Sequence, residues 1–316
     1  MLIEANGRPF RWDTEEGALR DGGLAARLRT VLRKWSSLRT PVSAILPAPL
    51  NPPKIGLALG GGFARGVAHV GVLNVLRREN IPVHCIAGVS AGAIVAAAYA
   101  SGTALDVIGK IGCGMRFNHV ARWSLCRLGL AGSERMTEFL KRLLKKLRFE
   151  EMETPLGVVA TDLRTGESVP FLDHGDVILP IRASCSYPGL FQPIRHEERM
   201  LVDGAMSMEV PALVARKMGA THVISVGLPM QGPAVVPENM LQVVNRCFQI
   251  LQSRAEETWR RHSDVVITPD VQSVRWDGFE SGQEMITAGE MAAEAALPQI
   301  RKWLAPASEP VQELAS

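Results

Sequence analysis

The stretch Pro82-Val-His-Cys-Ile-Ala-Gly-Val-Ser-Ala-Gly-Ala-Ile-Val-Ala-Ala-Ala-Tyr99 decides the fold of this chain. Its first part, Pro82 to Ala87, is a short apolar run that predicts a buried strand. Its last part, Ser90 to Tyr99, is uncharged and rich in alanine, and it predicts a buried helix. A Gly-Val-Ser-Ala-Gly turn joins the two parts, so the stretch predicts a strand, a sharp turn and a helix.

The same alternation continues on both sides of this stretch. Lys54–Leu59 predicts a short buried strand, and the glycine-rich loop after it opens a helical pattern that ends near Asn80. Apolar runs at Leu156–Thr161 and His222–Gly227 predict two more strands, each close to a helical pattern. Strands that alternate with helices are typical of α/β proteins, so we predict a mostly parallel sheet with helices on both faces.

The turn between strand and helix matches the Gly-x-Ser-x-Gly pattern of a nucleophile elbow. Gly88 and Gly92 flank the serine because the turn is too tight for side chains, and the hydroxyl of Ser90 then projects above the sheet. The helix that follows directs its N-terminal amides to the same place, which favours negative charge there. We predict that Ser90 is a nucleophile.

A second glycine-rich loop, Gly60-Gly-Gly-Phe-Ala-Arg-Gly66, follows the strand before the elbow. Its spacing is not Gly-x-Gly-x-x-Gly, and it lacks the Gly-Lys-Ser/Thr of a P-loop, so nucleotide binding is not favoured. Its place one strand before the elbow favours an oxyanion hole, in which the amides of Gly61, Gly62 and Ala91 donate to a tetrahedral intermediate. Arg65 adds a fixed positive charge there or pairs with a carboxylate.

A nucleophilic serine also needs a base. The five histidines downstream of Ser90 are poorly placed: His222 looks like the start of a strand, and His196 lies in a charged turn. By contrast, Leu201-Val-Asp-Gly-Ala205 is a short apolar strand that ends in Asp-Gly, where Asp203 would have clearance to reach the serine. An Asp-Gly turn alone is more often only a turn, so the residues by themselves leave the base open.

Composition and charge narrow the functional classes. The chain has 316 residues, 47% of them apolar, and a net charge of +3, which is too mild to indicate nucleic-acid binding. Its five cysteines form no CxxC pair, as expected for reduced thiols. The first residues include acids and no apolar run, so no signal peptide is expected. Ile81–Leu105 is free of charge, but its Gly-Val-Ser-Ala-Gly turn argues against a membrane span.

Two basic segments each have two interpretations. In residues 1–53, an amphipathic helical pattern at Leu24–Leu38 precedes a proline-rich linker, and this helix either docks on the main domain or lies on an anionic membrane. The segment Lys110–Arg148 carries ten basic residues and two acidic ones, with aromatic and leucine residues interleaved. It predicts either a solvated helix at Glu134–Leu147 or an active-site flap that also touches lipid head groups.

The motifs together resemble the patatin-like phospholipase family, in particular bacterial members related to the catalytic domain of neuropathy target esterase. The stretches that carry the resemblance are Gly60–Gly66, Gly88–Gly92, Val159–Gly166, Arg182–Pro193, Asp203–Ala205 and Phe279–Glu290. The resemblance implies a patatin-type three-layer α/β/α sandwich and a Ser–Asp dyad that works without histidine, metal or cofactor. It implies that Ser90 is the nucleophile and Asp203 the base, with Gly60, Gly61, Gly62 and Arg65 around the oxyanion.

The chain departs from the family pattern at two places. Phe63 stands where relatives usually carry Gly or Ala, and it would narrow the acyl pocket or move the loop. After Asp203-Gly-Ala205 relatives usually carry Asn, whereas this chain has Met206, so a side-chain amide that would brace the loop is missing. We interpret both departures as tuning of the site.

The resulting prediction is a lipid acyl hydrolase of the phospholipase or lysophospholipase type. A transacylase, a His-dependent esterase and a regulatory protein on a disabled hydrolase scaffold are the alternatives. We expect an arm at 1–53, a hydrolase domain at 54–304 and a tail at 305–316. The expected location is the cytoplasm, with peripheral contact to the inner membrane; the expected partners are phospholipid or lysophospholipid and an anionic membrane surface. Head group, acyl length and oligomeric state are not predicted.

Overall fold

A computed structural model describes residues 52–228, 236–275 and 277–304 of the chain. The chain divides into two units, Met1–Asn51 and Pro52–Ser316, and all the described residues belong to the second. The predicted amphipathic helix at Leu24–Leu38 and the predicted tail at 305–316 lie outside the described residues.

The second unit is built on an eight-stranded sheet with the order β10-β9-β1-β2-β5-β8-β7, in which β6 pairs with β5 off this path. Its strands are β1 (Ile55–Leu59), β2 (Cys85–Gly88), β5 (Leu156–Asp162), β6 (Ser168–Phe171), β7 (Ile194–His196), β8 (Arg199–Asp203), β9 (His222–Val226) and β10 (Val265–Ile267). The five strands from β10 to β5 are mutually parallel, whereas β6, β7 and β8 are antiparallel additions at the β5 edge. The predicted mostly parallel sheet is therefore confirmed.

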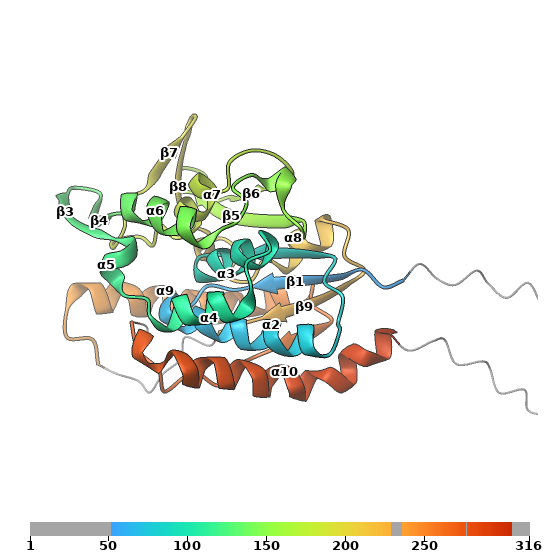
Figure 1. The fold of residues 1–316 in the computed structure, drawn as a ribbon. Helices are drawn as coiled ribbons and strands as arrows, with labels where there is room; N and C mark the ends of the chain where they lie inside the picture. Colours follow the sequence, from blue (N-terminus) through green and yellow to red (C-terminus); the bar gives the residue numbers. More distant parts are fainter. Residues whose placement is uncertain (1–51, 229–235, 276, 305–316) are drawn as a thin grey trace, which may run out of the picture. The chain divides into compact units, whose positions relative to one another are not determined.

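Helices cover the sheet on both sides. The longer helices are α2 (Ala68–Arg78), α3 (Ala91–Ala100), α4 (Leu105–Cys113), α6 (Glu134–Leu143), α7 (Ile178–Ser184), α8 (Ala212–Lys217), α9 (Met240–Arg260) and α10 (Gly282–Leu304). Helix α10 runs alongside α2 beneath the sheet in Figure 1, and α4 lies next to α2. The remaining elements are α5 (Phe117–Val120), the hairpin β3 (Arg122–Cys126) and β4 (Gly129–Gly132), and the short 3-10 turns η1 (Phe63–Val67), η2 (Phe149–Glu151), η3 (Gly204–Met206) and η4 (Phe279–Ser281).

Successive side chains of the central strands point to opposite faces of the sheet, so each face has its own apolar core. Leu57 and Leu59 of β1 belong to the larger core, which includes side chains from α2, α3 and α10. Ala58, between them, belongs to a second core with α8 and Trp259 of α9. A strand buried on both faces needs a continuous apolar run, which explains why Ile55–Leu59 carries no polar residue. The layers make a three-layer α/β/α sandwich, as the sequence predicts.

Several element boundaries differ from the predicted ones. Strand β2 begins at Cys85 and not at Pro82: its pairing with β1 starts at Cys85, and proline lacks the amide hydrogen that a sheet ladder needs. Helix α6 ends at Leu143, whereas the pattern predicted a helix as far as Leu147. Leu144 takes extended backbone angles (φ −90°, ψ 135°), which stop the helix there and correct that prediction. The uncharged stretch Ile81–Leu105 forms β2, the turn and α3, and no helix in the described part of the chain has both the length and the apolar character needed to cross a bilayer.

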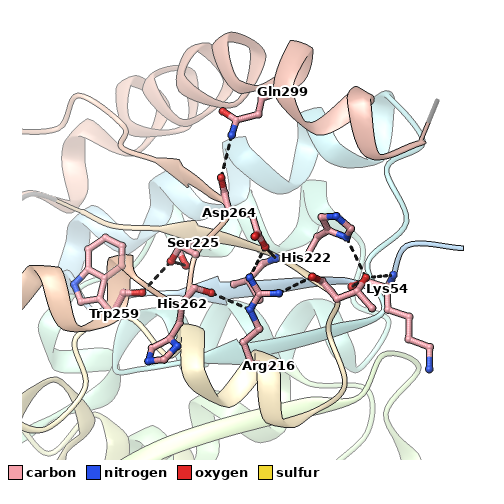
Figure 2. A network of polar contacts seen from close by, with 11 residues as sticks. Lys54, Arg216, His222, Ser225, Trp259, His262, Asp264 and Gln299 are labelled. Atoms are coloured by element: carbon pink, nitrogen blue, oxygen red, sulfur yellow. Dashed lines mark hydrogen bonds and ion pairs between the residues drawn. The ribbon is translucent and has the colours of Figure 1, made fainter. Parts of the chain in front are cut away.

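A polar network ties the strand starts together, away from the elbow (Figure 2). The guanidinium of Arg216, on α8, donates to the Asp264 carboxylate and to the carbonyls of Thr221 and His262. Asp264 also accepts from the Val223 amide at 2.6 Å. These bonds join α8, β9, β10 and the end of α9, and they fix the edge of the sheet at which the parallel strands begin.

Candidate active site

The elbow adopts the geometry that its glycines were expected to permit. Ser90 has φ 54° and ψ −124°, a strained conformation for a residue with a side chain. A Cβ on Gly88 would lie 2.5 Å from the Gly92 carbonyl oxygen, and a Cβ on Gly92 would lie 2.5 Å from the Gly60 carbonyl oxygen. Backbone atoms occupy the space at both positions, so only glycine fits on either side of Ser90.

Strand register brings Ser90 and Asp203 to the same level of the sheet. Strand β5 lies between β2 and β8, with Gly88 opposite Val158 and Asp203 opposite Ala160. Ser90 is two residues beyond Gly88 and Ala160 is two beyond Val158, so Ser90 and Asp203 leave the sheet at the same height on either side of β5. Both residues line one small cavity.

One segment braces both residues. The Ser184 hydroxyl accepts from the Ser90 amide at 2.8 Å and donates to the Val159 carbonyl at 2.6 Å. Two residues on, the Ser186 carbonyl accepts from the Asp203 amide at 3.0 Å. Ser184 is fully buried, so these bonds form away from competing water. The end of α7 therefore holds the strained elbow and the carboxylate strand in a fixed relation.

The Asp203 carboxyl is buried, with 1% of the residue exposed. Oδ1 accepts from the Ala205 amide at 2.9 Å, and Oδ2 is buried without a hydrogen-bond partner among the described residues. Burial raises the pKa of Asp203 from 3.8 to about 7, although the Ala205 amide and the neighbouring Ser90 hydroxyl act in the opposite direction. A carboxylate with a pKa near neutrality is a stronger base than an exposed one, as a serine nucleophile requires.

The backbone amides predicted to donate to the oxyanion differ in whether they already donate to another group. The Gly60 amide donates to the Val226 carbonyl at 3.0 Å, so Gly60 is committed to the strand end. The Gly61 amide donates weakly to the Glu209 carbonyl at 3.4 Å. The amides of Gly62 and Ala91 have no acceptor among the described residues, which leaves them as the readiest donors.

Arg65 has a structural partner. Its guanidinium donates through Nε and Nη2 to the Val274 carbonyl, at 2.9 and 2.7 Å. Only 5% of the residue is exposed, and burial lowers the pKa of its guanidinium. These two bonds hold the loop before η4 against η1.

His69, which the sequence analysis did not single out, supports the same loop from below. Its ring is fully buried, and Nε2 lies 2.9 Å from the Gly60 carbonyl oxygen. Because that oxygen can only accept, Nε2 carries the proton. Burial lowers the pKa of His69 to about 4, so the ring is neutral near pH 7 and acts as a fixed donor to Gly60.

Two cavities of different character meet at Ser90. The larger has a volume of about 760 Å³ and is lined mainly by apolar side chains from η1, α3, α4, α5, α6 and β3. The smaller, of about 10 Å³, contains Asp203, Gln252 and Glu209. Ser90 lines both cavities, and so does Phe63, whose ring packs edge-on against Tyr187 at 5.1 Å. Phe63 therefore forms part of the wall between the two cavities.

Two of the five histidines downstream of Ser90, His222 and His262, lie away from the elbow. His222 begins β9 on the level of Ile55, four residues before the β1 end that leads to the glycine loop. At about 3.3 Å per residue, this separates it from the Ser90 level by more than about 13 Å. Its ring stacks on Trp303 and contacts Thr221 (Nδ1 to Oγ1, 3.0 Å), while His262 follows α9 in the network of Figure 2. This geometry does not favour His222 or His262 as the base.

The loop after Asp203 is braced although it lacks the family asparagine. Thr161 Oγ1 donates to the Asp203 carbonyl at 2.9 Å and lies 2.8 Å from the Ser207 hydroxyl. From α9, the Gln252 amide donates to the Ala205 carbonyl at 3.5 Å. Side chains from distant parts of the sequence thus make the bracing contacts that the family asparagine was expected to make. Thr161 lies in the Val159–Gly166 stretch that resembles the family, but its bracing role has no signal there, and Gln252 is one polar residue in an otherwise ordinary helix.

A serine in a strand–turn–helix elbow beside a buried carboxylate, on an α/β/α sandwich, is an arrangement typical of α/β serine hydrolases. Comparison with known proteins makes the class specific: the model of the family described as patatin-like phospholipase matches residues 57–216. The chain belongs to the patatin-like phospholipase family, as the sequence motifs indicate.

The relatives fit this assignment. An uncharacterized NTE family protein of Mycobacterium tuberculosis is 32% identical over 181 residues, which cover 56% of this chain and 50% of the relative. Lysophospholipase NTE1 of Mycosarcoma maydis is 29% identical over 222 residues, covering 64% of this chain and 12% of that protein. The chain thus spans half or less of the length of these relatives. VipD from Legionella pneumophila has the same fold, with a TM-score of 0.53 at 13% identity over 79% of this chain and 68% of VipD.

Proposed function

We propose that this protein is a lipid acyl hydrolase of the phospholipase or lysophospholipase type. Ser90 attacks the ester carbonyl while Asp203 takes its proton. The amides of Gly62 and Ala91, with that of Gly61, stabilise the oxyanion, and the alcohol leaves to give an acyl-enzyme. The observation that carries the proposal is the place of Ser90 between a large apolar cavity and a small one that contains a buried carboxylate.

The cavity of about 760 Å³ fits a fatty acyl chain. Its volume is in the usual range for ligand sites, and its walls include Val70, Ile94, Ile108, Met136 and Phe139. Such a surface offers an acyl chain apolar contact and offers few hydrogen-bonding groups to a polar substrate. The family match and the name of the Mycosarcoma maydis relative support the same substrate class.

The first test is covalent labelling combined with fatty-acid release. A fluorophosphonate probe should label the wild type on the tryptic peptide of residues 79–110, which contains Ser90, and should not label Ser90→Ala. The wild type should release fatty acid from phospholipid or lysophospholipid micelles with calcium chelated. A folded wild type that neither takes up the probe nor releases fatty acid would overturn the proposal and favour the regulatory scaffold.

The β3–β4 hairpin supports the predicted contact with lipid. Trp123 lines the larger cavity and is 66% exposed, while Leu128 at the hairpin turn is 55% exposed. Arg122 and Arg127 are exposed on the same hairpin. Exposed apolar residues flanked by arginine are typical of a surface that inserts into the head-group region of an anionic membrane.

We expect Leu128→Glu to weaken binding to anionic vesicles about 10-fold, since it removes apolar surface and adds a repelled charge. Hydrolysis of a dissolved short-chain ester should be unchanged, because Leu128 does not line either cavity. Leu163→Glu is the matched control: Leu163 is 52% exposed and follows β5, away from the hairpin sequence. Vesicle pelleting measures the difference, and equal losses in both variants would contradict a specific role for the hairpin.

A further inference from the structure

The smaller cavity has room for one molecule of water. Its volume is about 10 Å³, close to the minimum that a water requires. The residues around it are Gly61, Gly62, Phe63, Ser90, Tyr187, Asp203, Ala205, Glu209 and Gln252. The nucleophile and the carboxylate both border it, so a molecule held there would lie next to the reacting atoms and apart from the acyl cavity.

Two buried acceptors in this cavity lack hydrogen-bond partners. They are Asp203 Oδ2 and Gln252 Oε1, each with almost no exposed area and no hydrogen bond to the described residues, although the Ser90 hydroxyl lies close enough to lower the pKa of Asp203. Glu209 and Tyr187, at the same cavity, have partners: Glu209 Oε2 accepts from the Trp259 indole at 3.2 Å, and the Tyr187 hydroxyl donates to Asn245 at 2.8 Å. A buried acceptor without a donor costs about 1–3 kcal/mol, and in the acyl-enzyme Ser90 Oγ carries the acyl group and no proton, so one donor that reaches both acceptors would stabilise the pair.

The direction of the Gln252 amide follows from its neighbour. Gln252 Nε2 faces the Ala205 carbonyl at 3.5 Å, and a carbonyl can only accept. With the amide reversed, Oε1 would face the Ala205 carbonyl oxygen, and two acceptors would repel each other. Oε1 is therefore the atom that points away from the Ala205 carbonyl. Gln252 is 8% exposed, and its position on α9 is fixed by packing against the Asp203 loop.

We propose that this cavity holds the water that hydrolyses the acyl-enzyme, and that Gln252 positions it by accepting a hydrogen bond from one of its O–H groups while Asp203 accepts a hydrogen bond from the other. A water molecule has two donors, which matches the two unpartnered acceptors. The proposal rests on the proposed function and deepens it, because a site built for water directs the acyl group to hydrolysis and away from transfer to another alcohol.

The water, Ser90 and Asp203 account for every bond and proton of the deacylation step. The water oxygen attacks the acyl carbon of the Ser90 ester, and its proton passes to Asp203 Oδ2. The tetrahedral intermediate then collapses: the bond from the acyl carbon to Ser90 Oγ breaks, the fatty acid leaves, and Asp203 returns the proton to Ser90 Oγ. Gln252 exchanges no proton in this step. It is a positioning residue that acts on the direction of the water.

The test separates acylation from deacylation in Gln252→Met, which keeps the length of the side chain and removes the acceptor together with the 3.5 Å contact from Nε2 to the Ala205 carbonyl. With a dissolved p-nitrophenyl ester, kcat should fall about 10-fold or more, because a misplaced water attacks slowly. KM should fall in parallel, so kcat/KM stays within about twofold. A burst of p-nitrophenol should appear, and intact-mass measurement should find acylated Ser90. Gln249→Met, on the same helix and outside both cavities, should behave as wild type.

A second variant, Gln252→Asn, withdraws the amide by one methylene and keeps it polar. Its kcat should fall about threefold while kcat/KM stays unchanged. This variant keeps the proposal testable if Gln252→Met does not fold. Unchanged kcat in both variants, or an equal loss of kcat and kcat/KM without acyl-enzyme, would overturn the role of Gln252. These results would leave the proposed function intact, whereas a wild type without esterase activity and without probe labelling would remove that function itself.

Discussion

Asp203→Asn should abolish fatty-acid release and, above pH 7, make the protein more stable. The activity falls because the amide cannot take the Ser90 proton, and losses of about 10⁴-fold are usual when the carboxylate of a serine hydrolase is removed. In the wild type, kcat/KM should rise with pH through a midpoint near the Asp203 pKa of about 7, since only the ionised form is a base.

The gain in stability follows from the direction of the same pKa shift. Burial raises the pKa of Asp203 from 3.8 to about 7, so the folded protein binds the proton more tightly than the unfolded chain does. Between these two values the wild type therefore loses stability as pH rises, and the full cost is present above pH 7. A shift of about three units corresponds to about 4 kcal/mol at most, which asparagine avoids because it carries no charge.

Thermal unfolding at pH 5, 7 and 9 measures this effect. The melting temperature of Asp203→Asn should exceed that of the wild type by up to about 10 °C at pH 9, and the difference should shrink toward pH 5. Asp162→Asn is the matched control, because Asp162 is also buried but its Oδ1 accepts from the Arg164 amide at 3.0 Å at the end of β5. Retained activity in Asp203→Asn, or a stability difference independent of pH, would contradict the assignment of Asp203 as the buried base.

The parts of the site that the sequence could predict are those built from neighbouring residues. The elbow is local: a buried strand, Gly88, Ser90, Gly92 and a helix lie within one short stretch, and each has a separate physical signal. The candidacy of Asp203 needed more, because an Asp-Gly turn has many uses, and only the order of the motifs singled it out. The sheet register then supplies a geometric reason, since β2 and β8 flank β5 and place Ser90 beside Asp203.

The parts that could not be predicted depend on contacts between distant segments. Ser184 reaches the Ser90 amide across 94 residues, and Gln252 reaches the Ala205 carbonyl across 47. Periodicity identifies which face of α7 or α9 is apolar, but it does not say what a single polar residue on that face will meet. The same limit explains the missing asparagine: its absence is visible in the sequence, whereas the bracing contacts of Thr161 are visible only in the fold.

Gly92→Ala should reduce activity about 100-fold or more and lower the stability of the fold. Helix propensity alone predicts the opposite, because alanine is favoured over glycine by about 1 kcal/mol inside a helix. The new methyl group, however, would overlap the carbonyl oxygens of Leu59 and Gly60. Since Gly60 begins the oxyanion loop and Ser90 is two residues away, relief of the overlap moves the amides and the nucleophile apart, and displacements of about 1 Å can cost about 100-fold.

The contrast with Gly109→Ala isolates this contact. Gly109 is a buried glycine in α4, and a Cβ there would lie 3.4 Å from Ile286 Cδ1 and 3.6 Å from Val70 Cγ1, which is ordinary contact. This variant should keep wild-type activity and unfold at the same temperature or slightly above it. The rate of fluorophosphonate labelling of Ser90 and the melting temperature are the two measurements. Equal behaviour of the two alanine variants would mean that the elbow tolerates a side chain at residue 92, and that the close approach of α3 to the oxyanion loop does not hold the nucleophile in place.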